Sequence, residues 1–227
     1  MANFDVSRPV DQANLTWNAE GQEGGKYHSR KLHVPSKLSG LTLGRGYDMA
    51  TKSASKIKQE LIMVGVAKKE AEAIAKAAGK RGNSAEKISA HEDLNNFEIG
   101  TSTQEKLFNL SYHEMESDVE RLMQKTDVVE AYGSVNLDTL DPKIKDLIVD
   151  LRFRGDYDGR SRALIQKHVV NNDIESLAAA LSKKDNWKNV PKDRFDRRVE
   201  YMNKAVEEKK KINAATNLQN AFRMTRP

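Results

Sequence analysis

The stretch from Glu20 to Met49, EGQEGGKYHSRKLHVPSKLSGLTLGRGYDM, decides how the rest of the chain is interpreted. It holds six of the 13 glycines, and glycine permits the positive φ angles that tight turns and close approach to a ligand require. Carboxylates stand near both of its ends, at Glu20, Glu23 and Asp48. The LTLG segment between them alternates apolar and polar residues, which predicts a β-strand. We therefore interpret this stretch as the functional site and the remainder as its frame.

The residues around Gly21 predict how Glu20 is held. The apolar side chains of Leu15 and Trp17 favour a short helix, and Gly21 is a typical helix stop. A carboxylate at the end of a packed helix can point into a cleft, although a solvated glutamate is the more common arrangement. Glycines and Pro35 make the following segment unsuitable for a helix, so we expect a strand within 27–34 that pairs with LTLG.

The chain after residue 51 predicts a series of amphipathic helices. In 53–64 the residues Ile57, Leu61 and Val64 fall at i, i+4 and i+7, which places them on one helix face. Further helices are expected at 68–78, 84–90, 102–125, 142–153, 160–170, 173–182 and 191–213. The predicted fold class is α+β, mostly α. We expect one domain over 1–227, with a β-containing lobe at about 11–60, a helical lobe at about 61–213 and a tail at 214–227.

Composition and charge limit the classes of partner. The 227 residues include 38 basic and 33 acidic ones, a formal net charge of +5, which favours a polyanionic partner such as nucleic acid, anionic lipid or a cell-wall polymer. The absence of cysteine excludes disulfides, a thiolate nucleophile and cysteine metal ligands. We expect no secretory signal, because the first ten residues lack a charged segment followed by an apolar one. We expect no membrane span, because no apolar run approaches about 18 residues.

Two carboxylates and a hydroxyl form the first candidate constellation: Glu20 or Glu23, with Thr42 and Asp48. Glycoside hydrolysis needs one carboxylic acid that protonates the leaving oxygen and one carboxylate that activates water or acts as the nucleophile. A glutamate at a helix end and an aspartate beyond a strand can supply this pair, and Thr42 can position a water. The spacing leaves open which glutamate is the acid.

Metal binding and nucleic-acid binding are the other two candidates. His28 and His33 lie five residues apart beside the carboxylates, but none of the five histidines forms an H-E-x-x-H pair, so we expect no metal and no cofactor. The 191–211 segment is strongly basic, with Phe195 and Tyr201 between its charges. Acidic residues interrupt it and no known nucleic-acid module has this spacing, so a surface helix of mixed charge is the simpler interpretation.

A further pattern is shared with a known enzyme family. The order of segments resembles the phage-type lysozyme fold: E-G comes first, then a variable segment, then T-x-G-x-G, and then helices. The motifs S-R-x-L-H-x-P at 29–35 and S-G-x-T-x-G-R-G-Y-D at 39–48 resemble the lysozyme-like muramidases of pesticin and of contractile (type VI) secretion effectors. The later part of the chain is also similar to that family. It contains an apolar helix over 144–153, the segment LAAALSK, Trp187 and an Arg-rich last helix. The resemblance covers about residues 11–205, and its N-terminal motif is the specific part.

The resemblance implies roles for individual residues. Glu20, in its E-G context after the first helix, matches the general acid. Thr42 matches the T-x-G threonine that helps to place the water, and Asp48 matches the G-Y-D aspartate that is the general base in the bacteriocin-like branch. Glu23-Gly24 repeats the E-G pattern, so Glu23 is the alternative acid. The phage enzymes carry their own base before the T-x-G strand, where this chain has no aspartate.

The implied activity is that of a peptidoglycan hydrolase, a muramidase that cleaves the β-1,4 bond between N-acetylmuramic acid and N-acetylglucosamine. We expect Tyr27, His33 and Arg45 to bind the substrate. The protein would be an antibacterial toxin, secreted effector or endolysin, made in the cytoplasm without a signal peptide and delivered to the wall by another system. We expect a monomer whose partner is peptidoglycan, with an immunity protein as a further candidate partner.

Three alternatives stay open at this point. A lytic transglycosylase shares the fold class, needs only the acid glutamate and yields a 1,6-anhydro sugar. A non-catalytic module would bind peptidoglycan without cleaving it. A helical nucleic-acid-binding protein would show a steep salt dependence and no affinity for the wall. The presence of Asp48 disfavours the transglycosylase, and the Gly-rich motif beside paired carboxylates disfavours the nucleic-acid-binding protein.

Overall fold

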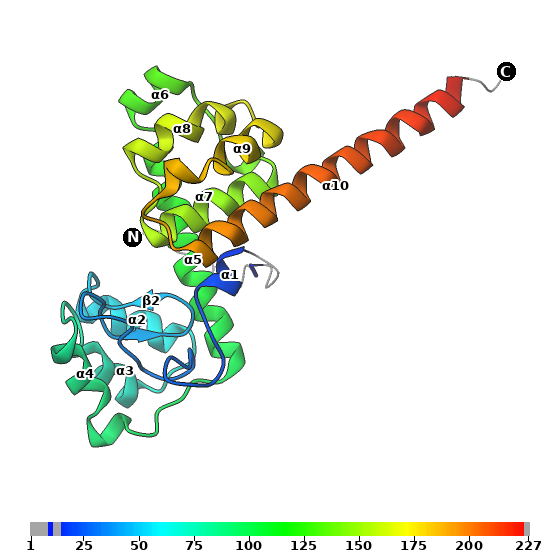
Figure 1. Cartoon of the computed structure of the whole chain (residues 1–227). Coiled ribbons are helices and arrows are strands. Elements are labelled where there is room, and N and C mark those ends of the chain that lie inside the picture. Colours follow the sequence, from blue (N-terminus) through cyan, green and yellow to red (C-terminus); the bar gives the residue numbers. More distant parts are fainter. Residues whose placement is uncertain (1–8, 11–14, 225–227) are drawn as a thin grey trace. The chain divides into compact units, whose positions relative to one another are not determined.

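The described part of the chain consists of helices and a small two-stranded β-hairpin, which confirms the predicted α+β, mostly α class. A computed structural model describes residues 9–10 and 15–224, apart from the side chains at 218 and 220–224. The chain divides into two compact units, one up to Glu116 and one from Ser117 onward (Figure 1). This division lies well beyond the lobe boundary expected near residue 60, because apolar residues as far along as Leu110 share the core of the hairpin.

The first unit contains the hairpin and the helices packed on it. Its elements are α1 (Leu15–Ala19), β1 (Thr42–Leu43), β2 (Tyr47–Asp48), α2 (Ala54–Met63), α3 (Lys68–Ala75), α4 (Asn83–Ser89), the 3₁₀ helix η1 (Glu92–Leu94) and the larger part of α5 (Thr101–Met123). The two strands pair antiparallel, with Thr42 opposite Asp48 and Leu43 opposite Tyr47. The strand expected within 27–34 is reduced to single bridges, of which one joins His33 to Thr42.

Alternation along the hairpin separates an apolar face from a polar one. The apolar face is fully buried and consists of Leu41, Leu43, Tyr47 and Met49. Because successive strand residues point to opposite faces, Thr42 and Asp48 point away from this core. Ile57 and Leu61 of α2 and Val64 at its C-cap are buried in the same core, which confirms their predicted common face.

Buried charges also anchor the hairpin. The Tyr47 hydroxyl donates a hydrogen bond of 2.6 Å to Glu60, a buried carboxylate of α2. Lys52 lies 3.2 Å from Glu60 and 2.6 Å from Glu114 of α5. Burial and the charge of Glu60 raise the pKa of Tyr47, so the phenol keeps its proton and remains a donor. These contacts fix the residue next to Asp48 to two helices.

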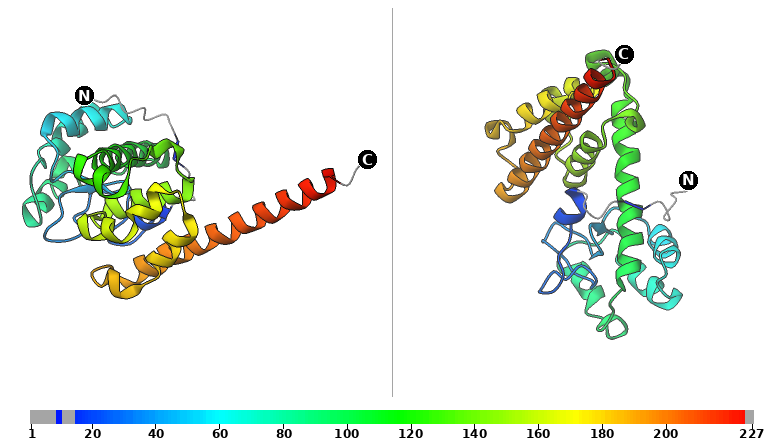
Figure 2. Two further views of the ribbon diagram at one scale, coloured as in Figure 1. Left: turned by 90° about the horizontal axis from the view of Figure 1, so that it is seen from above. Right: turned by 90° about the vertical axis from the view of Figure 1, so that its right-hand side faces the viewer.

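The second unit is a bundle of helices. After the end of α5 it contains α6 (Thr126–Tyr132), η2 (Leu137–Thr139), α7 (Pro142–Arg154), α8 (Gly159–Val170), α9 (Ile174–Leu181), η3 (Lys184–Trp187) and α10 (Lys192–Met224). The first half of α10 packs on α7 and α9, and Figures 1 and 2 show its second half running past them. Most of the tail expected at 214–227 is therefore helix, while residues 225–227 lie outside the described part. Every described helix is too short or too polar to span a lipid bilayer.

Two arginines of the basic segment on α10 turn inward. Arg198 is 1% exposed, and its guanidinium donates to Asp150 at 2.6 Å and to Asp156 at 2.7 Å. Arg194 donates to the same Asp150 at 3.1 Å. These internal ion pairs take two of the charges away from a surface patch, which weakens the nucleic-acid alternative.

Candidate active site

His33, Thr42 and Asp48 lie in one row across neighbouring segments of the first unit. Thr42 stands opposite Asp48 in the hairpin and opposite His33 in the isolated bridge. His33 and Thr42 exchange two backbone hydrogen bonds, of 3.1 and 2.8 Å. Directly opposed residues point to the same face, so these three side chains share the face turned away from the apolar core. The fold thus brings together three of the residues singled out in the sequence.

Gly40 ties Thr42 and Asp48 to each other. The Asp48 carboxylate accepts the amide hydrogen of Gly40 through Oδ2 at 3.0 Å and that of Ala50 through Oδ1 at 2.6 Å. The Thr42 hydroxyl donates to the Gly40 carbonyl at 3.3 Å. A Cβ on Gly40 would lie 2.4 Å from Oδ1 of Asp48, so the site requires glycine here. These bonds orient the Asp48 carboxylate, and each of its oxygens has a second lone pair with which to accept a water hydrogen.

Arg45 connects the hairpin turn to the backbone around Glu20. Its Nη1 donates to the carbonyl of Trp17 at 2.7 Å and to the carbonyl of Gly21 at 3.0 Å. The guanidinium also stacks on the Trp17 ring, 4.3 Å from the ring centroid. Glu20 follows α1 directly and is half-buried, and its amide donates to the carbonyl of Thr16. We predicted that Arg45 binds substrate, but its 9% exposure and its backbone partners favour a role in the frame of the site.

The contact of Arg45 with the backbone around Glu20 also explains the glycines at 21, 44 and 46. Gly44 and Gly46 flank Arg45 with φ angles of +61° and +84°, which side chains rarely tolerate. A Cβ on Gly21 would lie 2.4 Å from Cγ of Arg45. The E-G and G-R-G motifs are therefore the two sides of one close packing arrangement.

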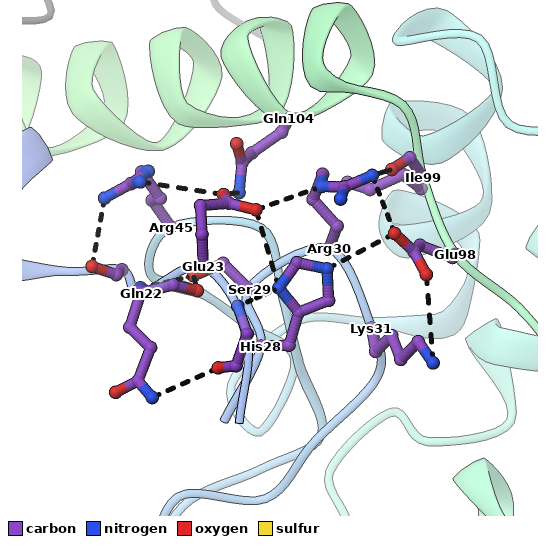
Figure 3. A network of polar contacts seen from close by, with 12 residues as sticks. Gln22, Glu23, His28, Ser29, Arg30, Lys31, Arg45, Glu98, Ile99 and Gln104 are labelled. Carbon is purple, nitrogen blue, oxygen red and sulfur yellow. Dashed lines mark hydrogen bonds and ion pairs between the residues drawn. The ribbon is translucent and has the colours of Figure 1, made fainter. Parts of the chain in front are cut away.

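Glu23, the alternative acid, lies in an ion-paired network (Figure 3). It accepts hydrogen bonds of 3.1 Å from Gln104 of α5 and 3.1 Å from Arg30, and Arg45 lies 3.7 Å away. Burial raises the pKa of Glu23, but the hydrogen bonds from Gln104 and Arg30 and the nearby positive charge outweigh burial, so the pKa is lowered overall. A general acid that works near neutral pH needs the opposite shift. This environment disfavours Glu23 as the acid.

Glu98 completes the network around Glu23. Arg30 bridges the two carboxylates, at 2.6 Å from Glu98. Nε2 of His28 lies 3.2 Å from Glu98, and its Nδ1 lies 2.8 Å from the amide nitrogen of Gly24 and 3.5 Å from Glu23. Both ring nitrogens of His28 therefore have protein partners. Within the described residues, no three His, Cys, Asp or Glu side chains are grouped to hold a metal ion.

Tyr27 and His33 form an aromatic pair beside the row. Their ring centroids lie 6.1 Å apart with an interplanar angle of 56°. Tyr27 is 39% exposed, and the Lys26 ammonium lies 5.2 Å from its ring centroid. An exposed tyrosine offers an apolar ring face with a polar tip, which suits contact with a sugar. The substrate-binding role of both residues stays a prediction.

Several residues that shape the site were not predicted from the sequence. Gln104 lies 81 positions after Glu23, so no local spacing relates them. Glu98 reaches the site from an irregular segment before α5, which has no periodic pattern. Tyr47 did carry a signal, because alternation with Asp48 places it on the core face, where a buried phenol needs a partner such as Glu60.

The chain can be assigned to a family of protein domains. Residues 13–199 match the family described as a domain of unknown function (DUF8812), and the protein belongs to that family. The matched range includes Glu20, Thr42, Arg45 and Asp48. A search of curated proteins found no match to this chain.

Proposed function

We propose that the protein is a lysozyme-like muramidase that hydrolyses the β-1,4 bond between N-acetylmuramic acid and N-acetylglucosamine in peptidoglycan. The observation that carries the proposal is the row of His33, Thr42 and Asp48, joined through Arg45 to the backbone on both sides of Glu20. This arrangement holds the E-G and T-x-G-R-G-Y-D motifs in one compact unit. Two carboxyl groups on separate, well-anchored segments are what acid/base glycoside hydrolysis requires.

Glu20 is the general acid in the proposed reaction. It gives its proton to the glycosidic oxygen while the bond from that oxygen to C1 of the muramic acid breaks. A half-buried carboxyl at the end of α1, with its neighbouring carbonyls bound to Arg45, is held in a defined place for this transfer. Defined placement is a large part of the rate that such a group supplies.

Asp48 is the general base, and Thr42 assists it. The Thr42 hydroxyl gives its hydrogen to the Gly40 carbonyl, so its oxygen can accept a hydrogen from water. A water that donates one hydrogen to Thr42 and one to Asp48 keeps a lone pair for attack on C1. As that water attacks, its proton passes to Asp48, and the direct displacement inverts the configuration at C1.

A lytic transglycosylase is the second candidate, because one observation favours it. Both carboxylate oxygens of Asp48 already accept backbone amide hydrogens, which also suits an aspartate with a purely structural role. In that case Glu20 acts alone as acid and then as base, and the C6 hydroxyl of the muramic acid takes the place of water. The product is then a 1,6-anhydro sugar.

The setting that we propose is the bacterial cell wall, reached through a separate delivery system, as for an antibacterial effector, a bacteriocin or an endolysin. The formal net charge of +5 would attract the protein to an anionic wall. Screening by salt weakens attraction between exposed charges, so wall lysis should decline as ionic strength rises.

Mass spectrometry of the fragments released from purified peptidoglycan tests the proposal. Reducing-end fragments that disappear in both Glu20→Gln and Asp48→Asn would support a two-carboxylate muramidase. Anhydro fragments that survive Asp48→Asn would support the transglycosylase and leave Asp48 a structural residue. Wall binding without release of any fragment would contradict both enzymes in favour of a binding module.

A further inference from the structure

We propose that Arg45 is the positioning residue for the acid Glu20, and that it acts through the backbone on both sides of that residue. The inference rests on the proposed function and deepens it. Arg45 lies in the hairpin turn, and its side chain reaches the carbonyls of Trp17 and Gly21 at 2.7 and 3.0 Å. Glu20 lies between these two residues in the chain.

One nitrogen atom holds both carbonyls, which has a mechanical consequence for Glu20. The last turn of α1 cannot unwind, and Gly21 cannot rotate away, without breaking a charge-assisted hydrogen bond to Nη1 of Arg45. The helix α1 has only five residues, and so short a helix depends on tertiary contacts for its stability. A guanidinium near its C-terminal end also complements the partial negative charge of that helix end.

Arg45 is itself held from several directions. Its guanidinium rests on the Trp17 ring, and that ring meets Phe108 of α5 edge-on with centroids 5.0 Å apart. Glu23 lies 3.7 Å from the other end of the guanidinium and balances its charge. Burial lowers the pKa of Arg45, and the charge of Glu23 acts against that effect. The Trp17 ring and the Glu23 carboxylate therefore lie on two sides of the Arg45 guanidinium.

Two substitutions separate hydrogen bonding from the space that the side chain fills. Methionine retains much of the length but cannot donate to either carbonyl. Lysine can donate from one nitrogen to two carbonyls, as Nη1 does, but it lacks the planar group that stacks on Trp17. A positioning residue acts on the reacting geometry, so we expect changes in kcat that exceed the changes in KM.

The test measures kcat and KM for fragment release by Arg45→Met, Arg45→Lys and the matched control Arg30→Met. Arg30 also binds Glu23, at 3.1 Å, but its described partners do not include Trp17 or Gly21. We expect kcat of Arg45→Met to fall about 100-fold. Its KM should change less than about threefold, Arg45→Lys should lose about tenfold in kcat, and Arg30→Met should stay within about threefold.

Two results of that experiment would overturn the inference. The first is a kcat for Arg45→Met close to that of the unmodified protein. The second is an equal loss of kcat in Arg30→Met, which would mean a general loosening of the unit. If circular dichroism shows that Arg45→Met does not fold, Arg45→Lys decides. A lowered kcat with KM retained then supports the role of Arg45, and an unchanged kcat overturns it.

Tryptophan fluorescence separates a failure of this inference from a failure of the proposed function. The chain has two tryptophans, so Trp187→Phe leaves Trp17 as the sole reporter. In that background Arg45→Met should increase quenching of Trp17 by acrylamide, while Arg30→Met should not. Absence of fragment release by the unmodified protein would contradict the proposed function, and increased quenching would still support the contact. Unchanged quenching in Arg45→Met would overturn the inference whatever the hydrolysis result.

Discussion

The pairs Glu20-Gly21 and Glu23-Gly24 share one dipeptide sequence three residues apart, yet the fold gives them opposite surroundings. Glu20 is half-buried at the end of α1, whereas the Glu23 side chain is 47% exposed and ion-paired. A Cβ on Gly21 would meet Arg45, whereas no described atom lies within 4 Å of a Cβ on Gly24. The dipeptide alone does not identify the acid, because the difference lies in the backbone contacts and in the lowered pKa of Glu23.

Among changes that leave both carboxyl groups in place, the largest effect should come from adding one methyl group to Gly21, and the same change at Gly24 is its matched partner. In Gly21→Ala the new Cβ would lie 2.4 Å from Cγ of Arg45 and 2.8 Å from Oγ of Ser29, so Arg45 must move. We expect a loss of about 100-fold in kcat, the size of effect that a displaced catalytic group produces. Gly24→Ala, at a φ of +79°, should cost about 1 kcal/mol of stability and change kcat little. Equal losses of kcat in both variants would break the comparison.

A smaller effect should appear on the hairpin side of the site. Thr42→Val keeps the shape of a strand residue but removes the oxygen that would accept a water hydrogen. We expect kcat to fall about tenfold, less than the roughly 100-fold or more lost with a general acid or base, because Thr42 only positions the water, while Thr42→Ser keeps most of it. Kinetics of fragment release with both variants check this. A Thr42→Val enzyme as fast as the unmodified one would remove Thr42 from the mechanism.

The removal of one buried hydroxyl should affect stability more than activity. In Tyr47→Phe, Glu60 loses a hydrogen-bond donor at 2.6 Å, and Lys52 at 3.2 Å and Lys56 at 3.6 Å remain its partners. An unsatisfied buried acceptor costs about 1–3 kcal/mol, and the two remaining lysines place our expectation at the lower end. Urea unfolding measures the loss. A stability equal to that of the unmodified protein would mean that this hydroxyl does not anchor β2.

The smallest expected effect is the pH dependence of the stability that Glu23 contributes. Its pKa is lowered in the fold, so its ionised form stabilises the protein above the unfolded-state pKa of about 4.3, and this contribution is lost as pH falls through the folded-state pKa. Glu23→Gln should therefore be slightly less stable than the unmodified protein at pH 7, by less than about 1 kcal/mol because the group is exposed. Urea unfolding at pH 7, 5 and 3 should show this difference shrinking with acid. A difference that stays constant would contradict the assigned pKa direction.

Repeating patterns in the sequence predicted most of the fold. The helices expected at 160–170 and 173–182 are α8 and α9, and the alternation of LTLG predicted β1, whereas its partner β2 was expected to be a turn. The sheet around 27–34 was overestimated, because the loops there make single bridges in place of a ladder. The boundary between the units was also missed, since it depends on which helices share a core and not on any local pattern.

For the site, motifs indicated the residues but not their contacts. Thr42 and Asp48 were both singled out, but their pairing in the hairpin was not predicted, because the segment after LTLG was expected to form only a turn. The bond from Arg45 to Trp17 spans 28 positions, and an arginine between two glycines looks the same in sequence whether it meets substrate or backbone. The contact of Gln104 with Glu23 likewise crosses irregular chain without periodicity.

The central claim is that Glu20 is the acid and that Glu23, in the same dipeptide context, is not. Fragment release by Glu20→Gln and by its matched control Glu23→Gln tests this most directly, because both changes replace a carboxyl by an amide of the same shape. We predict that Glu20→Gln loses about 1000-fold in kcat, as expected when a general acid is removed. Glu23→Gln should stay within about threefold of the unmodified protein. Near-normal release by Glu20→Gln, with the loss in Glu23→Gln instead, would contradict the account.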